Sequence, residues 1–257
     1  MAHEVGCSIR DGIATITLNR PEKRNALNAV LLDGLSAFVN ELEENRDVRV
    51  IVLRGEGKAF CSGMDLRELS ERQGRGGDPE GQVTAVFRQV ERCRHPTIAM
   101  VNGDALAGGC ELALHCDLRV AADHARFGMP LARLGLIVPF PLVCKLVEII
   151  GPAFTRQVLF TGQPVDARRA YEIGMVHQAV PLAELEKVTY DLARTVADNA
   201  PLALGGMKAS ILRAISLRER IHHEDLDELV DRARASADAR EGVKAMLEKR
   251  RPAFRGE

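Results

Sequence analysis

The sequence predicts an α/β fold followed by a helical C-terminal part, and two patterns support that prediction. In the N-terminal part, strand-like and helix-like segments alternate, and several strand-like runs are almost wholly aliphatic, as in parallel strands buried on both faces. From Pro181 onward, four segments look helical and no convincing strand separates them. A chain of 257 residues, 46% hydrophobic, is long enough to bury a substantial core without disulfides or metals.

The first predicted elements are a strand, a helix and a second strand. Residues 12–18 predict the first strand. Apolar residues then recur at helical spacing from Leu27 to Leu42, and Asn28 is the expected N-cap of that helix. Residues 48–53 form a nearly continuous aliphatic run, which predicts a strand buried on both faces. This order suggests a crossover unit with parallel strands.

A similar pattern follows further along the chain. Residues 96–101 predict a strand, residues 105–109 a small-residue loop, residues 110–115 an apolar helix, and residues 118–121 another short strand. The Gly- and charge-rich residues 73–79 show no apolar period and predict a mobile surface loop.

The C-terminal part is expected to be helical throughout. The segments that predict helices are residues 182–199, 201–215, 224–234 and 238–250. We divide the chain into a core of residues 1–195 and a helical subdomain of residues 196–257. Such a subdomain packs against neighbouring subunits or against its own chain, and composition leaves both possibilities open.

Charge and cysteine content exclude several classes of function. Lys and Arg number 35 and Asp and Glu number 36, so the chain lacks the basic footprint of a protein that binds nucleic acid or an anionic membrane. No apolar run is long enough to cross a bilayer. The six cysteines are scattered without a CxxC pair, so neither a disulfide framework nor a metal site is expected. The first ten residues lack the features of a signal peptide, which favours a cytoplasmic location.

Two loops carry the candidate chemistry. The first, residues 58–66, contains small residues and a glycine after a buried strand, where open α/β sheets place their ligands. The second, residues 107–111, leads through Gly108 and Gly109 directly into a helix, whose first-turn amides lack intrahelical acceptors. Neither loop contains GxGxxG or a P-loop lysine. Taken singly, each is an ordinary turn, but together they could direct two backbone donors at one oxygen.

These loops, with other motifs, resemble those of the crotonase family, the enoyl-CoA hydratases and isomerases, over essentially the whole chain. The matching motifs are Asn19-Arg20-Pro21, residues 25–28 (NALN), 59–66 (AFCSGMDL), 101–103 (VNG), 107–113 (AGGCELA), Cys116-Asp117, 126–128 (RFG), Leu134-Gly135 and 248–254 (EKRRPAF). The resemblance implies the crotonase fold, a ClpP-like spiral of ββα units with a C-terminal helical oligomerisation subdomain. It also implies a homotrimer or a hexamer.

The resemblance further implies an acyl-CoA substrate whose thioester oxygen lies between the backbone N–H groups of Met64 and Gly108. Such donors stabilise the enolate that forms in hydration, isomerisation or decarboxylation. No cofactor is expected, because coenzyme A enters as part of the substrate. The resemblance places the CoA moiety along Lys58, Ala59, Ser62, Asp65, Leu66 and Arg67. Arg24 is a weaker candidate for phosphate contact and is left outside the predicted set.

The acid and base groups are where the chain departs from the family pattern. Family hydratases use two carboxylates, and Glu111 occupies the position of the first. The second position is occupied by Leu131, which lines the substrate site but cannot move a proton. Residues 136–141 also differ from the glycine-rich loop of typical hydratases.

Three functions remain open. The first choice is hydratase or isomerase chemistry with Glu111 as the single acid/base. The second is decarboxylation of a malonyl-CoA-type thioester, since the presence of the first Glu and absence of the second also resemble the methylmalonyl-CoA decarboxylases. That branch carries a His where Met64 stands and a Tyr near Val138, so the match is partial. The third is an acyl-CoA binding protein without turnover, suggested by Leu131.

Overall fold

Two β-sheets form the centre of the protein. The computed structural model describes residues 4–65, 79–216 and 221–256. The larger sheet has the order β1-β2-β3-β5-β7-β10, with β1 antiparallel to β2 and every later pair parallel. Its strands are β1 (Val5–Arg10), β2 (Ile13–Leu18), β3 (Val50–Gly55), β5 (Thr97–Val101), β7 (Leu118–Ala122) and β10 (Gln178–Val180). All of β5 and most of β3 and β7 are buried, which explains their aliphatic composition.

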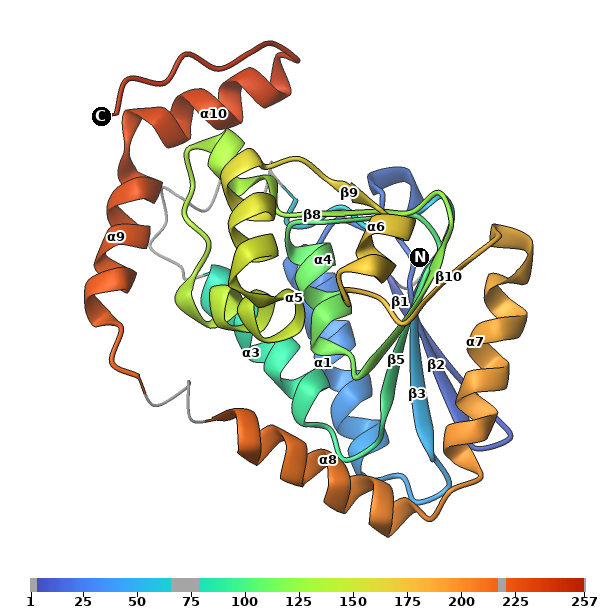
Figure 1. Ribbon diagram of the computed structural model, residues 1–257. Helices are drawn as coiled ribbons and strands as arrows, with labels where there is room; N and C mark the ends of the chain where they lie inside the picture. Colours follow the sequence, from blue (N-terminus) through green and yellow to red (C-terminus); the bar gives the residue numbers. More distant parts are fainter. Residues whose placement is uncertain (1–3, 66–78, 217–220, 257) are drawn as a thin grey trace.

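The smaller sheet is built from short strands that follow those of the larger one. It has the order β4-β6-β8-β9, with strands β4 (Ala59–Cys61), β6 (Asp104–Leu106), β8 (Arg126–Gly128) and β9 (Val165–Asp166). Three times in succession, a strand of the larger sheet is followed by a strand of the smaller one and then by a helix. Figure 1 shows the smaller sheet crossing above the larger one. This repeated ββα unit is the spiral expected of the crotonase fold.

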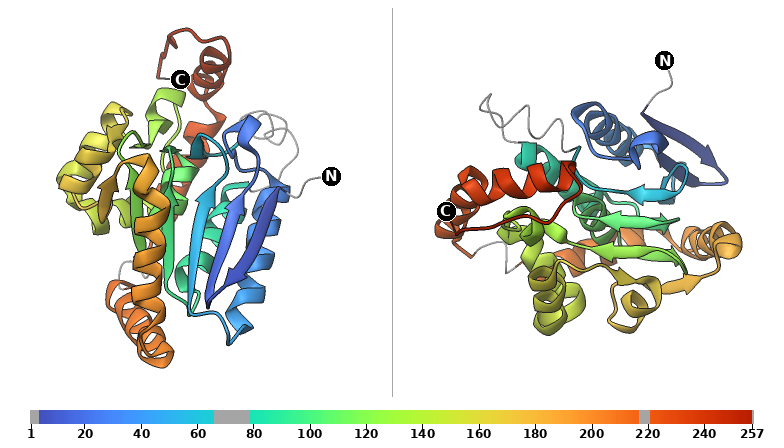
Figure 2. Two further views of the ribbon diagram at one scale, coloured as in Figure 1. Left: turned by 90° about the vertical axis from the view of Figure 1, so that its right-hand side faces the viewer. Right: turned by 90° about the horizontal axis from the view of Figure 1, so that it is seen from above.

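Helices cover both faces of the larger sheet. They are α1 (Ala29–Glu44), α3 (Pro79–Arg92), α4 (Gly108–His115), α5 (Phe140–Thr161), α6 (Ala167–Glu172) and α7 (Leu182–Ala197), with 3₁₀ turns η1 (Pro21–Lys23) and η2 (Pro130–Leu134). Helices α1, α3 and α4 lie side by side on one face, while α7 packs on the other against β2, β3, β5 and β7 (Figures 1 and 2). The first helix begins where its sequence predicts, because the Asn28 side chain accepts a hydrogen bond from the Leu31 amide at 2.8 Å.

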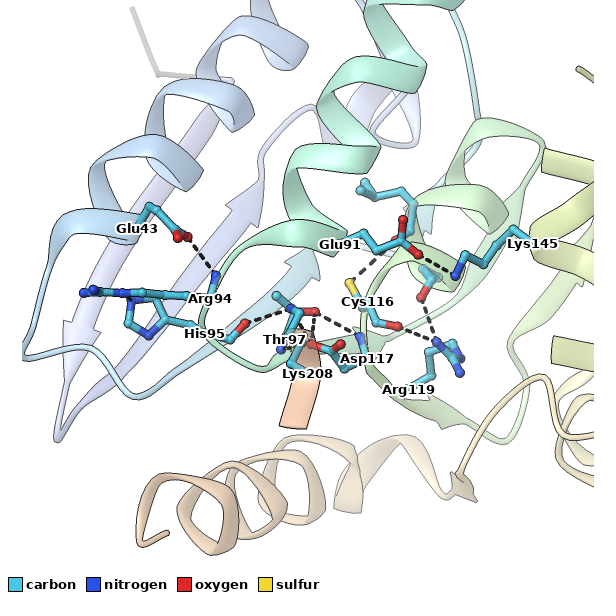
Figure 3. Close-up of polar contacts among 12 residues, drawn as sticks. Glu43, Glu91, Arg94, His95, Thr97, Cys116, Asp117, Arg119, Lys145 and Lys208 are labelled. Atoms are coloured by element: carbon cyan, nitrogen blue, oxygen red, sulfur yellow. Dashed lines mark hydrogen bonds and ion pairs between the residues drawn. The ribbon is translucent and has the colours of Figure 1, made fainter. Parts of the chain in front are cut away.

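Three C-terminal helices lie around the outside of this core: α8 (Pro201–Ile215), α9 (Glu224–Ala235) and α10 (Ala237–Leu247). Helix α8 is tied to the core by Lys208, whose ammonium group donates to the His95 carbonyl at 2.9 Å and to the Asp117 carboxylate at 2.7 Å (Figure 3). The same carboxylate accepts hydrogen bonds from the amide and hydroxyl of Thr97. Helix α10 packs against η2.

The structure confirms the strands and helices that the sequence predicted and adds several that it missed. Strand β1, helix α3, the two 3₁₀ turns and the elements from β8 to β10 were not predicted individually, and the short strands β4 and β6 lie in segments that were predicted as loops. In the predicted loop of residues 73–79, residues 73–78 lie outside the described residues, and Pro79 begins α3. The helix predicted at residue 110 already begins at Gly108. None of the described helices has the length and apolar character needed to cross a membrane.

Candidate active site

The two predicted loops meet at a cavity of about 400 Å³. The first loop contributes Ser62, Met64 and Asp65 to its wall, and the second contributes Ala107 and Gly108. Glu111 lines the same cavity from the first turn of α4. Residues about 50 positions apart in the sequence are therefore brought to one site, because β4 and β6 pair in the smaller sheet and each leads directly into its loop.

The Met64 amide is held in place by the segment that precedes α1. The Leu27 amide donates to the Gly63 carbonyl and the Asp65 amide donates to the Leu27 carbonyl, each at 2.8 Å. These two hydrogen bonds flank Met64 and leave its own N–H without a backbone acceptor among the described residues. Gly63 has φ of +92°, a left-handed conformation that an L side chain rarely adopts.

The Gly108 amide is presented by an unusual backbone conformation at Ala107. Ala107 has φ of +48° and ψ of −123°, a combination that costs of order 1–3 kcal/mol in a residue other than glycine. Its amide donates to the Gly128 carbonyl at 2.8 Å, which holds the turn. Gly108 then begins α4, so its N–H has no intrahelical acceptor. Strain at Ala107 thus accompanies the exposure of a backbone donor to the cavity.

The two donors lie close together in space. A β carbon placed on Gly108 would be 3.8 Å from the Met64 nitrogen, and one placed on Gly63 would be 3.2 Å from the Gly108 nitrogen. Both nitrogens are therefore close to the same pair of glycines, and neither N–H has a backbone acceptor in the described residues, an arrangement that suits a single developing oxyanion.

Glu111 lies one turn along α4 from Gly108. Its side chain is buried, and it faces the cavity from the helix end where backbone amides favour negative charge. One turn further on, the Nδ1 of His115 donates to the Glu111 carbonyl at 2.8 Å, since a carbonyl oxygen can only accept. Burial lowers the pKa of His115, which favours the neutral ring.

Apolar side chains form most of the rest of the cavity wall, and Lys23, Arg24 and Thr84 also line it. Leu131 lies in η2 and lines the cavity, as the sequence predicted, and no carboxylate stands at its position. The sequence analysis missed several lining residues, of which Val83 in α3, Leu142 in α5 and Met246 in α10 come from three different elements. The apolar spacing of residues 83, 86, 87 and 90 could have indicated α3, but nothing local to Met246 indicates that α10 covers this site.

The predicted CoA-contact residues divide between two cavities. Ser62 and Asp65 line the first, and the Asp65 carboxylate pairs with Arg20 at 3.3 Å. Lys58 and Ala59 line a separate pocket of about 540 Å³. Arg24, which was left outside the predicted set, lines both cavities. Its guanidinium group donates a hydrogen bond to the Asp104 carboxylate at 2.7 Å. Leu66 and Arg67, also predicted, lie outside the described residues.

No residues of the described chain gather as metal ligands. Within residues 4–65, 79–216 and 221–256, no group of three or more His, Cys, Asp or Glu side chains is placed to hold an ion.

Comparisons with known proteins show the family of this chain. The enoyl-CoA hydratase/isomerase family model matches residues 8–257. The chain is 34% identical over 241 residues to the short-chain-enoyl-CoA hydratase of Clostridium acetobutylicum, covering 93% of this chain and 92% of that protein. It is 35% identical over 247 residues to human mitochondrial enoyl-CoA hydratase domain-containing protein 3, covering 95% of this chain and 81% of that protein.

Solved structures agree with the sequence relatives. A methylmalonyl-CoA decarboxylase complexed with 2S-carboxypropyl-CoA superposes with a TM-score of 0.89 at 29% identity, covering 100% of both chains. An enoyl-CoA hydratase from Bacillus anthracis superposes with a TM-score of 0.76 at 30% identity, covering 99% of this chain and 100% of that one. The chain belongs to the enoyl-CoA hydratase/isomerase family, the crotonases, and it is an enzyme of that family.

Proposed function

We propose that the protein binds an acyl-CoA thioester with its carbonyl oxygen between the Met64 and Gly108 amides, and that Glu111 moves the proton. Hydratase or isomerase chemistry is the function that the site supports best. The observation that carries this proposal is the position of Glu111, which shares one cavity with both donors and lies one helical turn from Gly108.

Each part of the site has a role in this chemistry. When water adds at the β carbon, or when a proton leaves the carbon skeleton, negative charge gathers on the thioester oxygen. The two amides stabilise that charge without reorganising, because the backbone hydrogen bonds around Met64 and Ala107 hold them in place. Glu111 donates or accepts the proton that accompanies the change. No group beyond the CoA thioester is required.

Replacing Glu111 with Gln tests the proposal. The full-length chain is incubated in D₂O with crotonyl-CoA, a 3-enoyl-CoA and methylmalonyl-CoA, and products and deuterium uptake are followed by mass spectrometry. We expect Glu111→Gln to lower turnover by about 100-fold or more, because a positioned acid/base contributes roughly 10²–10⁴ in rate. Acyl-CoA binding should persist, since Gln retains the shape of the side chain.

The exposed Glu186 on α7 provides the matched control. Glu186→Gln makes the same chemical change outside the cavity and should leave turnover intact. Unchanged turnover in Glu111→Gln would exclude Glu111 as the acid/base. Binding without turnover or exchange in the parent protein would instead favour a non-catalytic acyl-CoA binding protein.

Decarboxylation of a malonyl-CoA-type thioester is the second candidate. Two observations favour it: the structural similarity to methylmalonyl-CoA decarboxylase, and the apolar Leu131 in place of a second carboxylate. Loss of carbon dioxide leaves an enolate directly and needs no base to start it, so the oxyanion donors suffice for that step. Release of carbon dioxide from methylmalonyl-CoA in the same assay would assign this reaction.

A homotrimer or hexamer remains our proposal for the assembly, with residues 1–195 as core and 196–257 as the trimerisation subdomain. Large apolar side chains exposed on α8 support it: Leu202 is 92% exposed, and Met207 and Ile211 are each 62% exposed. Light scattering that reports a monomer would contradict it. We also propose a cytoplasmic location, which is supported by the absence of a disulfide among the six cysteines, all of which lie in the described residues. Burial raises the pKa of Cys61, Cys110 and Cys116 to about 12.

A further inference from the structure

A second cavity, of about 590 Å³, lies behind the helix that carries Glu111. Helices α3, α4 and α5 each contribute to both cavities, and α8 also contributes to the second. On α4, Glu111 lines the first cavity and His115, one turn later, lines the second. On α5, Leu142 lines the first and Lys145 the second. The proposed mechanism uses none of the residues of the second cavity.

The second cavity contains a buried ion cluster. The Lys145 ammonium group contacts the Glu91 carboxylate at 2.5 Å (Figure 3). It also contacts the Glu148 carboxylate at 3.1 Å. Both Lys145 and Glu91 are only 9% exposed. Burial alone would lower the pKa of Lys145, but the two carboxylates outweigh burial and raise it. Both acidic side chains of the cavity wall are therefore already paired with one buried cation.

The remaining charges on the described wall are all positive. They are those of Arg88, Arg92 and Arg213, from α3 and α8. Arg88 and Arg213 have no carboxylate partner among the described residues. These two side chains therefore present guanidinium groups to the cavity without a carboxylate in the described part of the chain that would neutralise them. Separated guanidinium groups of this kind suit a phosphate or carboxylate.

Apolar and hydrogen-bonding groups complete the wall. Phe140 and Leu212 line the cavity, and the Phe140 ring lies 4.9 Å from the His223 ring, centroid to centroid. The Nδ1 of His115 donates a hydrogen bond to the Glu111 carbonyl. In the neutral ring, the Nε2 of His115 is therefore the nitrogen that can accept a hydrogen bond. A ligand with a partly apolar body would use this part of the wall.

We propose that the second cavity binds a small organic anion, a phosphate or carboxylate on a partly apolar body, through the guanidinium groups of Arg88 and Arg213. This site is distinct from the acyl-CoA cavity, and the proposal does not depend on which reaction the enzyme performs. The shared feature of possible ligands is the anionic group, so one probe of each kind is needed.

Isothermal titration calorimetry of the full-length chain with AMP and with adipate tests the proposal. Saturating butyryl-CoA is present throughout, so that anion binding in the first cavity does not contribute. We expect at least one of the two probes to bind at one site per chain. Arg88→Gln and Arg213→Gln should each weaken binding by roughly tenfold, because each removes a charge-assisted hydrogen bond. AMP binding would identify a phosphate ligand, and adipate binding a carboxylate ligand.

Two matched variants serve as controls. Arg46→Gln removes an exposed arginine that lies outside the cavity wall, and Glu111→Gln alters only the first cavity; both should bind as the parent does. Circular dichroism spectra of Arg88→Gln and Arg213→Gln establish that they are folded. The proposal is overturned if neither probe binds, if a probe binds only when butyryl-CoA is omitted, or if neither arginine variant changes the affinity.

Discussion

Replacing Gly109 with alanine is expected to prevent stable folding. A β carbon at this position would lie 2.1 Å from the Cys61 carbonyl oxygen and 2.6 Å from its carbonyl carbon. Both atoms belong to the backbone of β4, which is paired with β6 and cannot move without breaking the smaller sheet. Overpacking against a flexible side chain costs about 1–3 kcal/mol, and a clash with paired backbone costs more, out of a total stability of roughly 5–15 kcal/mol.

Urea unfolding followed by circular dichroism, together with the soluble yield, measures this effect. Gly206→Ala is the matched control, because nothing lies within 4 Å of the β carbon that it adds in α8. That variant should be as stable as the parent, or up to about 1 kcal/mol more stable, since alanine is the better helix former. A Gly109→Ala protein with the parent's unfolding midpoint would show that β4 and α4 are less closely packed than the structure has them.

Replacing the neighbouring Gly108 with alanine should leave the fold intact and remove activity. Here the added β carbon would lie 3.0 Å from Cδ1 of Leu27, the end of a side chain that can shift by a few tenths of an ångström. The same carbon would lie 3.8 Å from the Met64 nitrogen, so we expect it to crowd the proposed oxyanion position. We expect kcat/KM to fall by about 100-fold or more, the effect of losing one oxyanion donor.

Two measurements separate these effects: steady-state rates with whichever of the three thioesters the parent protein turns over, and thermal unfolding. The unfolding free energy should change by less than about 1.5 kcal/mol, as for other tolerated changes of core volume. An active Gly108→Ala protein would place the thioester oxygen elsewhere and would contradict the proposed donor pair. Substitutions at these adjacent glycines are thus expected to have different effects. Gly109→Ala should disrupt folding because Gly109 faces the backbone of β4, and Gly108→Ala should disrupt catalysis because Gly108 faces the cavity.

Local sequence signals predicted those elements whose pattern is strong over a short stretch. The aliphatic runs of β3 and β5 and the Asn28 cap of α1 depend on neighbouring residues, so they could be recognised directly. Strand β1 was missed because its second half is exposed and shows no alternation. Helix α3 was missed although Val83, Val86, Phe87 and Val90 have helical spacing.

The candidate site was predictable only where it is built from contiguous motifs. Met64, Gly108 and Glu111 lie in two short loops whose glycines and small residues have a direct backbone role. Arg24 was left outside the predicted set because an exposed arginine has no local signature of ligand contact. Only the fold brings it to Asp104 and to the walls of two cavities. Met246 reaches the site only because α10 packs on η2.

The sequence by itself determined the family, the two loops and Glu111 as the candidate acid/base. Each of these depends on residues that are adjacent in the sequence, so it can be recognised without knowledge of tertiary contacts. Tertiary structure decided which distant side chains share a wall. Arg88, Lys145 and Arg213 lie on three helices, and their charges act on one cavity only because α3, α5 and α8 are packed around it. Electrostatic interactions depend on the distance between charges in space, and the number of residues between two charges in the sequence does not determine that distance.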